Sequence, residues 1–266
     1  MEYQNLVAIV VAVIEGLTEF LPVSSTGHMI IAGNMLGFTG VVVDVFEIFI
    51  QFGAILSVIF IYPKRFAKFF TVDGWKKDKG FSAWHVLAGC IPCMAIAFFF
   101  YKYIKGYLFN PFTVAIGLIS GALLLLLAER FAKNRQLLDD LDKMTLHQAF
   151  AIGVFQILSL WPGFSRSGST IAGGMLAGLS RKVSASFTFI MAVPVMFAAS
   201  MYDLWKNYQT LSVNDIQTLA WGFLVAAVVA YLSIFWFVRF VGKNRLTVFV
   251  YYRIILAIFT FWYFYY

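Results

Sequence analysis

The amino-acid sequence predicts an all-α polytopic membrane protein with about six transmembrane helices plus two re-entrant helical hairpins arranged as inverted repeats. Three observations predict this fold: the composition, the apolar runs and an internal repeat. Of the 266 residues, 61% are hydrophobic and 12% are charged, whereas soluble domains carry roughly 45–50% apolar and about 25% charged residues. The net charge of +7 lies in short clusters between apolar runs, so we expect a lipid bilayer and no nucleic acid as partner.

Six apolar runs reach the length of about 17 residues that a transmembrane helix needs. They lie near 42–62, 84–101, 111–128, 184–202, 216–238 and 246–266. The second run contains Cys90 and Cys93 in a C-I-P-C sequence. We expect these cysteines to be small residues packed in a helix, because a redox pair would be expected beside a soluble βαβ pattern.

Two further stretches, 5–37 and 145–178, are apolar at both ends but interrupted by Pro, Gly, Ser and Thr together with ionisable residues. Such breaks at membrane depth are tolerated only where protein or a wet cavity shields the backbone. Both stretches are therefore predicted to be re-entrant hairpins.

An internal repeat relates these two hairpins. Residues 15–37 align without a gap on 156–178, and the identical pairs are Leu17/Leu158, Ser24/Ser165, Gly27/Gly168, Ile30/Ile171, Gly33/Gly174 and Gly37/Gly178. The single membrane domain 1–266 then divides into repeat one (1–128), a cytoplasmic connection (129–144) and repeat two (145–266). Each repeat has one hairpin and three spans, and this odd number inverts the second copy. A site is expected where the broken helices meet.

The basic residues predict the orientation of the chain. Most Lys and Arg residues lie in loops 63–83 and 129–144 or beside 181 and 239–245. Cytoplasmic loops carry such an excess, so both termini are expected outside. A Gly-x-x-x-Gly spacing at Gly117 and Gly121 favours close helix packing.

The first hairpin carries acids and hydroxyls. Glu15 and Glu19 share one helical face and can hold a divalent cation (Mg or Ca) or relay a proton; alternatively they mark the membrane interface. After Pro22, the sequence Ser24-Ser25-Thr26 is suited to cap a helix whose start attracts an anion. Because His28 stands beside these polar groups, we predict that the cluster is catalytic rather than only a helix cap.

The second hairpin replaces the acids with a base. Arg166 stands among Ser165, Ser167 and Thr170, and its planar guanidinium fits phosphate. Its partner is either a carboxylate of the first hairpin or a substrate phosphate. Acids, an imidazole, hydroxyls and one Arg at mid-membrane meet the needs of phosphoryl transfer, and such a site favours a substrate with a lipid tail.

Two motifs carry a resemblance to a known family. E-G-L-T-E-F-L-P-V-S-S-T-G-H at 15–28 and P-G-x-S-R-S-G-S-T at 162–170 resemble the signatures of the bacitracin-resistance type of undecaprenyl-diphosphate phosphatase. The resemblance implies a hydrolase that recycles the carrier lipid of cell-wall synthesis in the bacterial inner membrane. It also implies a site on the outer side and a divalent cation.

The resemblance assigns residues to roles. It implies catalytic roles for Glu15, Glu19, Ser25, His28 and Arg166, and roles in substrate binding for Thr26, Ser165 and Thr170. We also expect Ser24 and Ser167, which adjoin these residues, to bind substrate. Our hypothesis is that Arg166 holds the diphosphate, and that either Ser25 attacks with His28 as base or His28 activates water. The competing interpretation is a transporter or flippase of an anionic isoprenoid lipid. The sequence leaves open whether a homodimer forms.

Overall fold

The computed structural model describes residues 2–38, 41–76, 80–133, 136–207 and 216–266. These residues form helices and no strand, with one isolated β-bridge between Leu138 and Leu179. The all-α prediction is confirmed. Of the basic residues expected in the cytoplasmic loops, Lys77, Lys79 and Arg135 lie outside the described residues.

Six long helices coincide with the six predicted spans. They are α3 (Val41–Ile61), α5 (Ala83–Leu108), α6 (Pro111–Ala132), α9 (Arg181–Asn207), α10 (Ile216–Val241) and α11 (Thr247–Tyr265). Five of them are each long and apolar enough to cross a membrane. Helix α3 meets the same criterion together with α4 (Pro63–Phe69), which is bent from it by 92°. The protein is therefore a multi-pass membrane protein. Cys90 and Cys93 are buried, free cysteines of α5, as predicted.

Both predicted hairpins are present as a helix, a break and a second helix. The first consists of α1 (Glu2–Thr18) and α2 (Ser25–Leu36), and the second of α7 (Leu146–Gln156), the 3₁₀ turn η3 (Ile157–Leu160) and α8 (Arg166–Leu176). Their apolar parts are shorter than the long helices. The remaining turns, η1 (Val72–Trp75) and η2 (Leu141–Lys143), lie in the connections.

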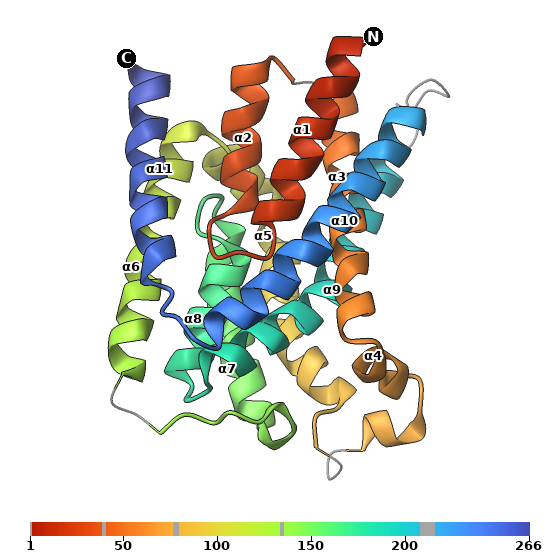
Figure 1. The fold of residues 1–266 in the computed structure, drawn as a ribbon, viewed down its shortest axis with the longest axis vertical. Coiled ribbons are helices and arrows are strands. Elements are labelled where there is room, and N and C mark those ends of the chain that lie inside the picture. Colours follow the sequence, from red (N-terminus) through yellow and green to blue (C-terminus); the bar gives the residue numbers. More distant parts are fainter. Residues whose placement is uncertain (1, 39–40, 77–79, 134–135, 208–215) are drawn as a thin grey trace.

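The arrangement of the helices can be compared with the predicted repeat. In Figure 1 both termini lie at the top, whereas α4 and the connection between α6 and α7 lie at the opposite end. Helix α1 packs against α10, and α7 packs against α5. The alignment of the two halves matches α1 with α7 and α5 with α10, so these two contacts are equivalent. The inverted symmetry itself and the boundaries of the repeats stay predictions.

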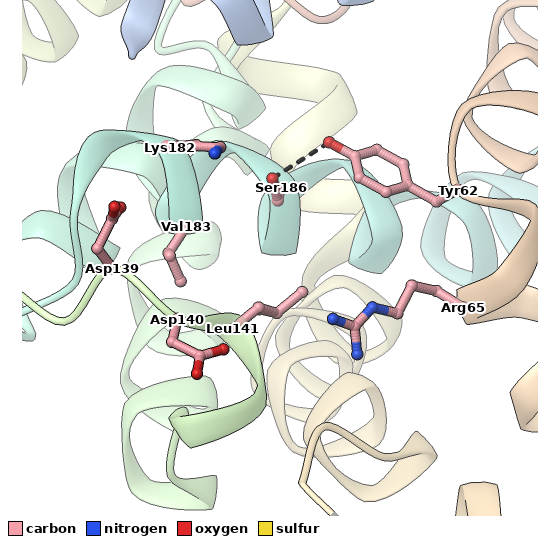
Figure 2. Close-up of a pocket in the computed structure, with 8 residues that line it drawn as sticks. All are labelled: Tyr62, Arg65, Asp139, Asp140, Leu141, Lys182, Val183 and Ser186. Carbon is pink, nitrogen blue, oxygen red and sulfur yellow. Dashed lines mark hydrogen bonds between the residues drawn. The ribbon is translucent and has the colours of Figure 1, made fainter.

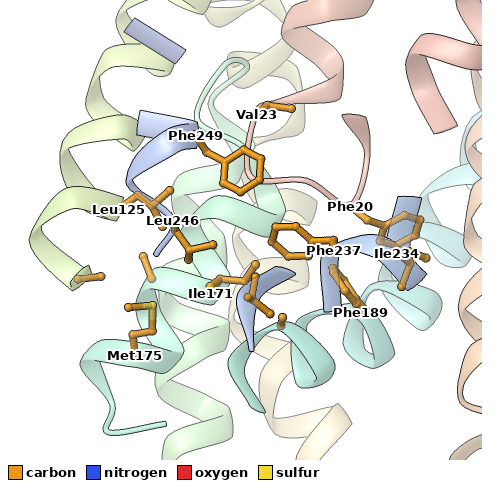
Figure 3. Close-up of a cluster of buried hydrophobic side chains, with 14 of the residues drawn as sticks. Phe20, Val23, Leu125, Ile171, Met175, Phe189, Ile234, Phe237, Leu246 and Phe249 are labelled. Atoms are coloured by element: carbon orange, nitrogen blue, oxygen red, sulfur yellow. The ribbon is translucent and has the colours of Figure 1, made fainter. Parts of the chain in front are cut away.

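One apolar core supports the breaks of both hairpins. Phe20 from the first break, Ile171 of α8 and Phe189 of α9 are fully buried in it, together with Phe237 of α10 (Figure 3). The rings of Phe20 and Phe189 meet edge to face, with centroids 5.3 Å apart, a favourable geometry for aromatic pairs. Because both halves contribute to this core, it fixes the two breaks relative to each other.

Candidate active site

Two serines begin the inner helices of the hairpins in the same unusual way. Ser24 and Ser165 have φ values of 71° and 72°, the only positive φ values of non-glycine residues in the described part of the chain. Each side chain caps its helix and accepts a hydrogen bond from the amide three residues on, at 3.3 Å from Gly27 and 3.1 Å from Gly168. Such backbone strain costs about 1–3 kcal/mol and concentrates at functional sites. The predicted caps are confirmed.

The two breaks touch each other, as the repeat predicts. The Ser167 hydroxyl donates to the Leu21 carbonyl oxygen at 2.7 Å, and Arg166 Nη2 donates to Glu19 Oε1 at 2.9 Å. Both bonds join residues of one hairpin to residues of the other. The starts of α2 and α8, where backbone N–H groups lack intrahelical acceptors, therefore lie close together.

A cavity of about 260 Å³ lies at this junction. Six of the predicted site residues line it: Glu19, Ser24, Ser25, Thr26, Ser165 and Arg166. Three further lining residues lie outside both hairpins: Gln51 of α3 and Met196 and Ala199 of α9. Of these, only Gln51 carries a signal in the sequence, because it is a polar residue within an apolar span.

Arg166 is the cation of this cavity. Besides Glu19, its guanidinium donates to the Thr188 carbonyl oxygen at 3.3 Å, and it lies 5.5 Å from the centroid of the Phe20 ring. Its Nε is buried and has no hydrogen-bond partner. Of the two partners considered for Arg166, the carboxylate is therefore present, and the guanidinium still lines the space where an anion fits.

Glu19 connects the acid and hydroxyl groups of the site. One of its oxygens binds Arg166, and the other accepts a hydrogen bond from the Ser25 hydroxyl. The side chains of Arg166 and Glu19 are only 14% and 8% exposed, so this ion pair is shielded from water. A carboxylate bonded to a hydroxyl is placed to accept its proton.

Glu15 lies behind Glu19 and does not line the cavity. It is fully buried, and neither of its carboxylate oxygens has a hydrogen-bond partner. Glu19 and Glu47 are near enough to interact with it electrostatically. Oxygen ligands of this kind suit Mg²⁺ or Ca²⁺, and the orphaned carboxylate fits such an ion. The described residues contain no group of three or more His, Cys, Asp or Glu placed to hold a metal, so the cation stays a prediction.

In the described structure the imidazole of His28 makes no hydrogen bond to Ser25. Its Nδ1 lies 2.7 Å from the Ser24 carbonyl oxygen and its Nε2 lies 2.6 Å from the Tyr252 hydroxyl. It is absent from the lining of the cavity. The geometry thus pairs Ser25 with Glu19 rather than with the imidazole.

Ser167 and Thr170 stand behind the second break and do not line the cavity either. Thr170 is fully buried; its hydroxyl donates to the Arg166 carbonyl oxygen at 2.8 Å and accepts from the Thr188 hydroxyl at 2.9 Å. The structure therefore places Thr170 where it holds the backbone at Arg166, and Ser167 where its hydroxyl joins the second break to Leu21 of the first.

Arg253 of α11 is a residue that the sequence analysis did not assign to the site. It is fully buried, and its guanidinium donates to five carbonyl oxygens of the two breaks and α6. These belong to Pro22, Gly163, Phe164, Gly117 and Leu118. An arginine within an apolar span was the available signal. It holds both hairpins at once.

The Gly-x-x-x-Gly spacing of α6 is explained by this arrangement. A Cβ at Gly117 would overlap the Pro162 carbonyl oxygen, and a Cβ at Gly121 would overlap the Arg253 guanidinium. The two glycines therefore make room for the second break and for the arginine that holds it.

A second cavity, of about 210 Å³, lies where the start of α9 meets the α3–α4 bend (Figure 2). Arg65 and Lys182 line it together with Asp139 and Asp140. None of the predicted site residues is among its lining residues. The junction of the hairpins is therefore the candidate active site.

The fold and the site define a polytopic membrane protein with a cavity, lined by an arginine and two helix starts, between two broken helices. Residues 8–259 match the family model of bacitracin resistance protein BacA. The chain is 44% identical over 254 residues to undecaprenyl-diphosphatase 1 of a Bacillus cereus strain, and the match covers 95% of this chain and 96% of the relative. It is also 44% identical over 252 residues to undecaprenyl-diphosphatase 1 of Bacillus anthracis, at 94% and 95% coverage. The chain belongs to the BacA family.

Proposed function

We infer that the protein hydrolyses undecaprenyl diphosphate to undecaprenyl phosphate and inorganic phosphate. Its relatives carry the name of this activity, and the family extends over nearly the whole chain. The observation that carries the inference is the cavity in which Arg166, Glu19 and Ser25 lie together at two helix starts. A cavity of this kind binds a phosphate through a guanidinium fork and backbone N–H groups.

The residues suggest how the anhydride bond is broken. Arg166 and the helix starts position the terminal phosphate and neutralise charge in the transition state. Glu19 accepts the Ser25 proton, and Ser25 Oγ attacks the terminal phosphorus. The bond from this phosphorus to the bridging oxygen breaks, and the lipid monophosphate leaves. Water then hydrolyses the phosphoserine.

In the alternative course, Glu19 takes a proton from water, and Ser25 only binds the phosphate. The two courses differ in one covalent intermediate. Trapping phosphoserine at position 25 supports the first, whereas a Ser25→Ala variant with near-normal turnover supports the second.

We propose that a divalent cation, Mg²⁺ or Ca²⁺, assists this reaction. Glu15 and Glu19 would hold it, and when bound it would neutralise charge on the diphosphate. The balance of charge supports this assignment, because two carboxylates face one guanidinium and the substrate adds further negative charge. Neither carboxylate oxygen of Glu15 has a hydrogen-bond partner within the described structure.

We propose that the site faces the outer side of the bacterial inner membrane, where the reaction would recycle the carrier lipid of peptidoglycan synthesis. Met196 and Ala199 line the cavity from the part of α9 that follows its midpoint, towards Asn207. That end of α9 is remote from the basic residues Arg181 and Lys182 at its start. If the basic loops are cytoplasmic, the cavity lies towards the outside.

The decisive experiment measures phosphate release from undecaprenyl diphosphate by the purified protein in detergent. Arg166→Gln is expected to lower kcat/KM by about 10²–10³-fold, because an electrostatic group of the transition state is lost. The matched control is Arg130→Gln, which removes an exposed arginine of α6 and should act as the wild type. Binding of the lipid without release of phosphate by the wild type would reject the phosphatase and favour the transporter.

A further inference from the structure

We propose that His28 is a positioning residue whose tautomer is fixed by Tyr252, and that neither residue exchanges protons with the substrate. The proposal rests on the phosphatase reaction and assigns a role within the same site. It follows from three observations: the partners of the two ring nitrogens, the peptide group that His28 holds, and the absence of this arrangement from the second hairpin.

The hydrogen bonds define the tautomer of His28. A carbonyl oxygen only accepts, so Nδ1, which lies 2.7 Å from the Ser24 oxygen, carries the hydrogen. In the neutral ring Nε2 is then an acceptor, and the Tyr252 hydroxyl at 2.6 Å donates to it. The two rings are also nearly parallel, at 4°, with centroids 5.6 Å apart. Both nitrogens are thus engaged within the protein.

The bond to Ser24 acts on the backbone that faces the cavity. In a trans peptide the C=O and the following N–H point in opposite directions. When His28 holds the Ser24 carbonyl, it therefore turns the Ser25 N–H to the opposite side. Ser24 and Ser25 line the cavity, whereas His28 does not. The imidazole thus sets the direction of one N–H donor and of the serine that carries it.

The strain at Ser24 explains why such a bond is needed. A non-glycine residue at φ 71° adopts this conformation only where its surroundings impose it. The backbone amide of His28 also donates to the same carbonyl oxygen, at 3.2 Å. The side chain adds a second bond to this oxygen and holds the strained peptide more firmly.

The second hairpin lacks this device. Ser169 occupies the position that matches His28; its amide donates to the Ser165 oxygen at 2.9 Å, and its hydroxyl donates to the Arg166 oxygen at 3.0 Å. No ring in the described structure reaches the Ser165 carbonyl. The imidazole is therefore confined to the hairpin that carries Ser25, whose geometry must be accurate for attack or for phosphate binding.

Tyr252 adjoins Arg253 on α11, and the Arg253 guanidinium donates to the Pro22 oxygen at 3.4 Å. Adjacent residues of the last helix thus hold the first break from two sides. Tyr252 lies outside both sequence motifs, and only packing of α11 beside α2 brings it to His28.

The first test separates a positioning residue from a base. His28→Asn keeps an N–H donor near the position of Nδ1 but takes up no proton at neutral pH, whereas His28→Ala has no donor. We expect His28→Asn to stay within about tenfold of the wild-type kcat, the worth of one hydrogen bond, with an unchanged pH profile. We expect His28→Ala to be much weaker. If His28→Asn is as inactive as His28→Ala and one limb of its pH profile disappears, His28 is the base and the proposal fails.

The second test uses a double-mutant cycle. Tyr252→Phe removes only the hydroxyl, which weakens the preference for the Nδ1–H tautomer, and should lower kcat by up to about tenfold with KM unchanged. In the His28→Asn background the same change should have no effect, because an amide has no tautomer to fix. An equal loss in both backgrounds would overturn the role of Tyr252. The control is Tyr251→Phe, a neighbouring residue that is 65% exposed.

A spectroscopic measurement makes failure of this proposal distinguishable from failure of the phosphatase assignment. Nitrogen-15 NMR of the labelled histidines, with the His28 signals identified from His28→Asn, should show the Nδ1–H tautomer in the wild type and a mixture in Tyr252→Phe. An Nε2–H tautomer in the wild type would refute the arrangement. This result needs no substrate and no turnover.

Discussion

The two hairpin breaks share a backbone and differ in chemistry. Ser24 and Ser165 have nearly the same positive φ, and each caps its helix by accepting from a glycine amide. The matched positions nevertheless carry different side chains: Glu15 with Gln156, Ser25 with Arg166, and His28 with Ser169. The first break thus supplies carboxylates and a hydroxyl, and the second supplies a cation.

Two copies of one backbone motif can therefore form an asymmetric site. The shared backbone brings two helix starts together, which gives N–H donors for an anion from both sides. The divergent side chains then divide the work, with Glu19 and Ser25 on one side and Arg166 on the other. Phosphoryl transfer requires both kinds of group, because the carboxylate that accepts a proton and the guanidinium that binds the phosphate oxygens must contact the phosphate from different directions.

We expect the strongest effect from substitution of Arg253, because this residue holds both hairpins. Arg253→Met removes the guanidinium that joins five backbone carbonyls of the two breaks and α6, so we expect a loss of about 3–5 kcal/mol in stability. Phosphate release should fall with it. Thermal unfolding in detergent measures the loss, with Arg130→Met as the exposed control. A wild-type melting temperature would show that the breaks are held without Arg253.

A smaller effect tests the contrast between Glu15 and Gln156. Glu15→Gln gives the first hairpin the residue of the second, and we expect activity to fall by about 10²-fold. Stability should not fall, because an uncharged amide is less costly to bury than a carboxylate. Phosphate release and thermal unfolding are measured together. Full activity would mean that Glu15 has no part in the reaction.

The reverse exchange, Gln156→Glu, sharpens the same contrast. It places a carboxylate in a fully enclosed position without a cation site, so it should lower the melting temperature. An unchanged melting temperature would show that the second hairpin accepts charge as readily as the first.

The shared backbone predicts equal effects at the two caps. Ser24→Ala and Ser165→Ala each remove a cap and should cost about 0.5–2 kcal/mol. Ser24→Gly and Ser165→Gly should cost less, because glycine adopts a positive φ without strain. The melting temperatures of the four variants make the comparison. A loss confined to one hairpin would show that the caps are alike in geometry but not in energy.

The smallest effect lies away from both breaks. Arg65 binds Asp142 at 2.5 and 2.8 Å and, mainly through these hydrogen bonds, lowers the pKa of Asp142. A lowered pKa stabilises the fold above the ordinary value of about 3.9, and this stability is lost as pH falls through the folded pKa. Asp142→Asn should therefore cost at most about 1 kcal/mol at pH 7 and nothing in stronger acid. Phosphate release should be unchanged, and a large loss of it would contradict the separation of this end from the site.

Much of the fold follows from local patterns. The six spans are apolar runs of membrane length, and the breaks contain Pro22 and Pro162 beside serines, so helix ends and caps follow from short-range sterics and hydrogen bonding. The repeat placed Glu19, Ser25 and Arg166 at matching breaks, and the cavity confirms that they lie together.

The class of fold, the two broken hairpins and the types of group at their ends could be predicted from the sequence, because residues near one another in the chain set these features. The partner of each group could not be predicted in this way: it is Glu19 rather than His28 for Ser25, Tyr252 for His28, and the carbonyls of both breaks for Arg253. These partners depend on how each helix is rotated about its axis and on how helices far apart in the chain pack. Local periodicity leaves several such rotations open, and burial of the common core selects one.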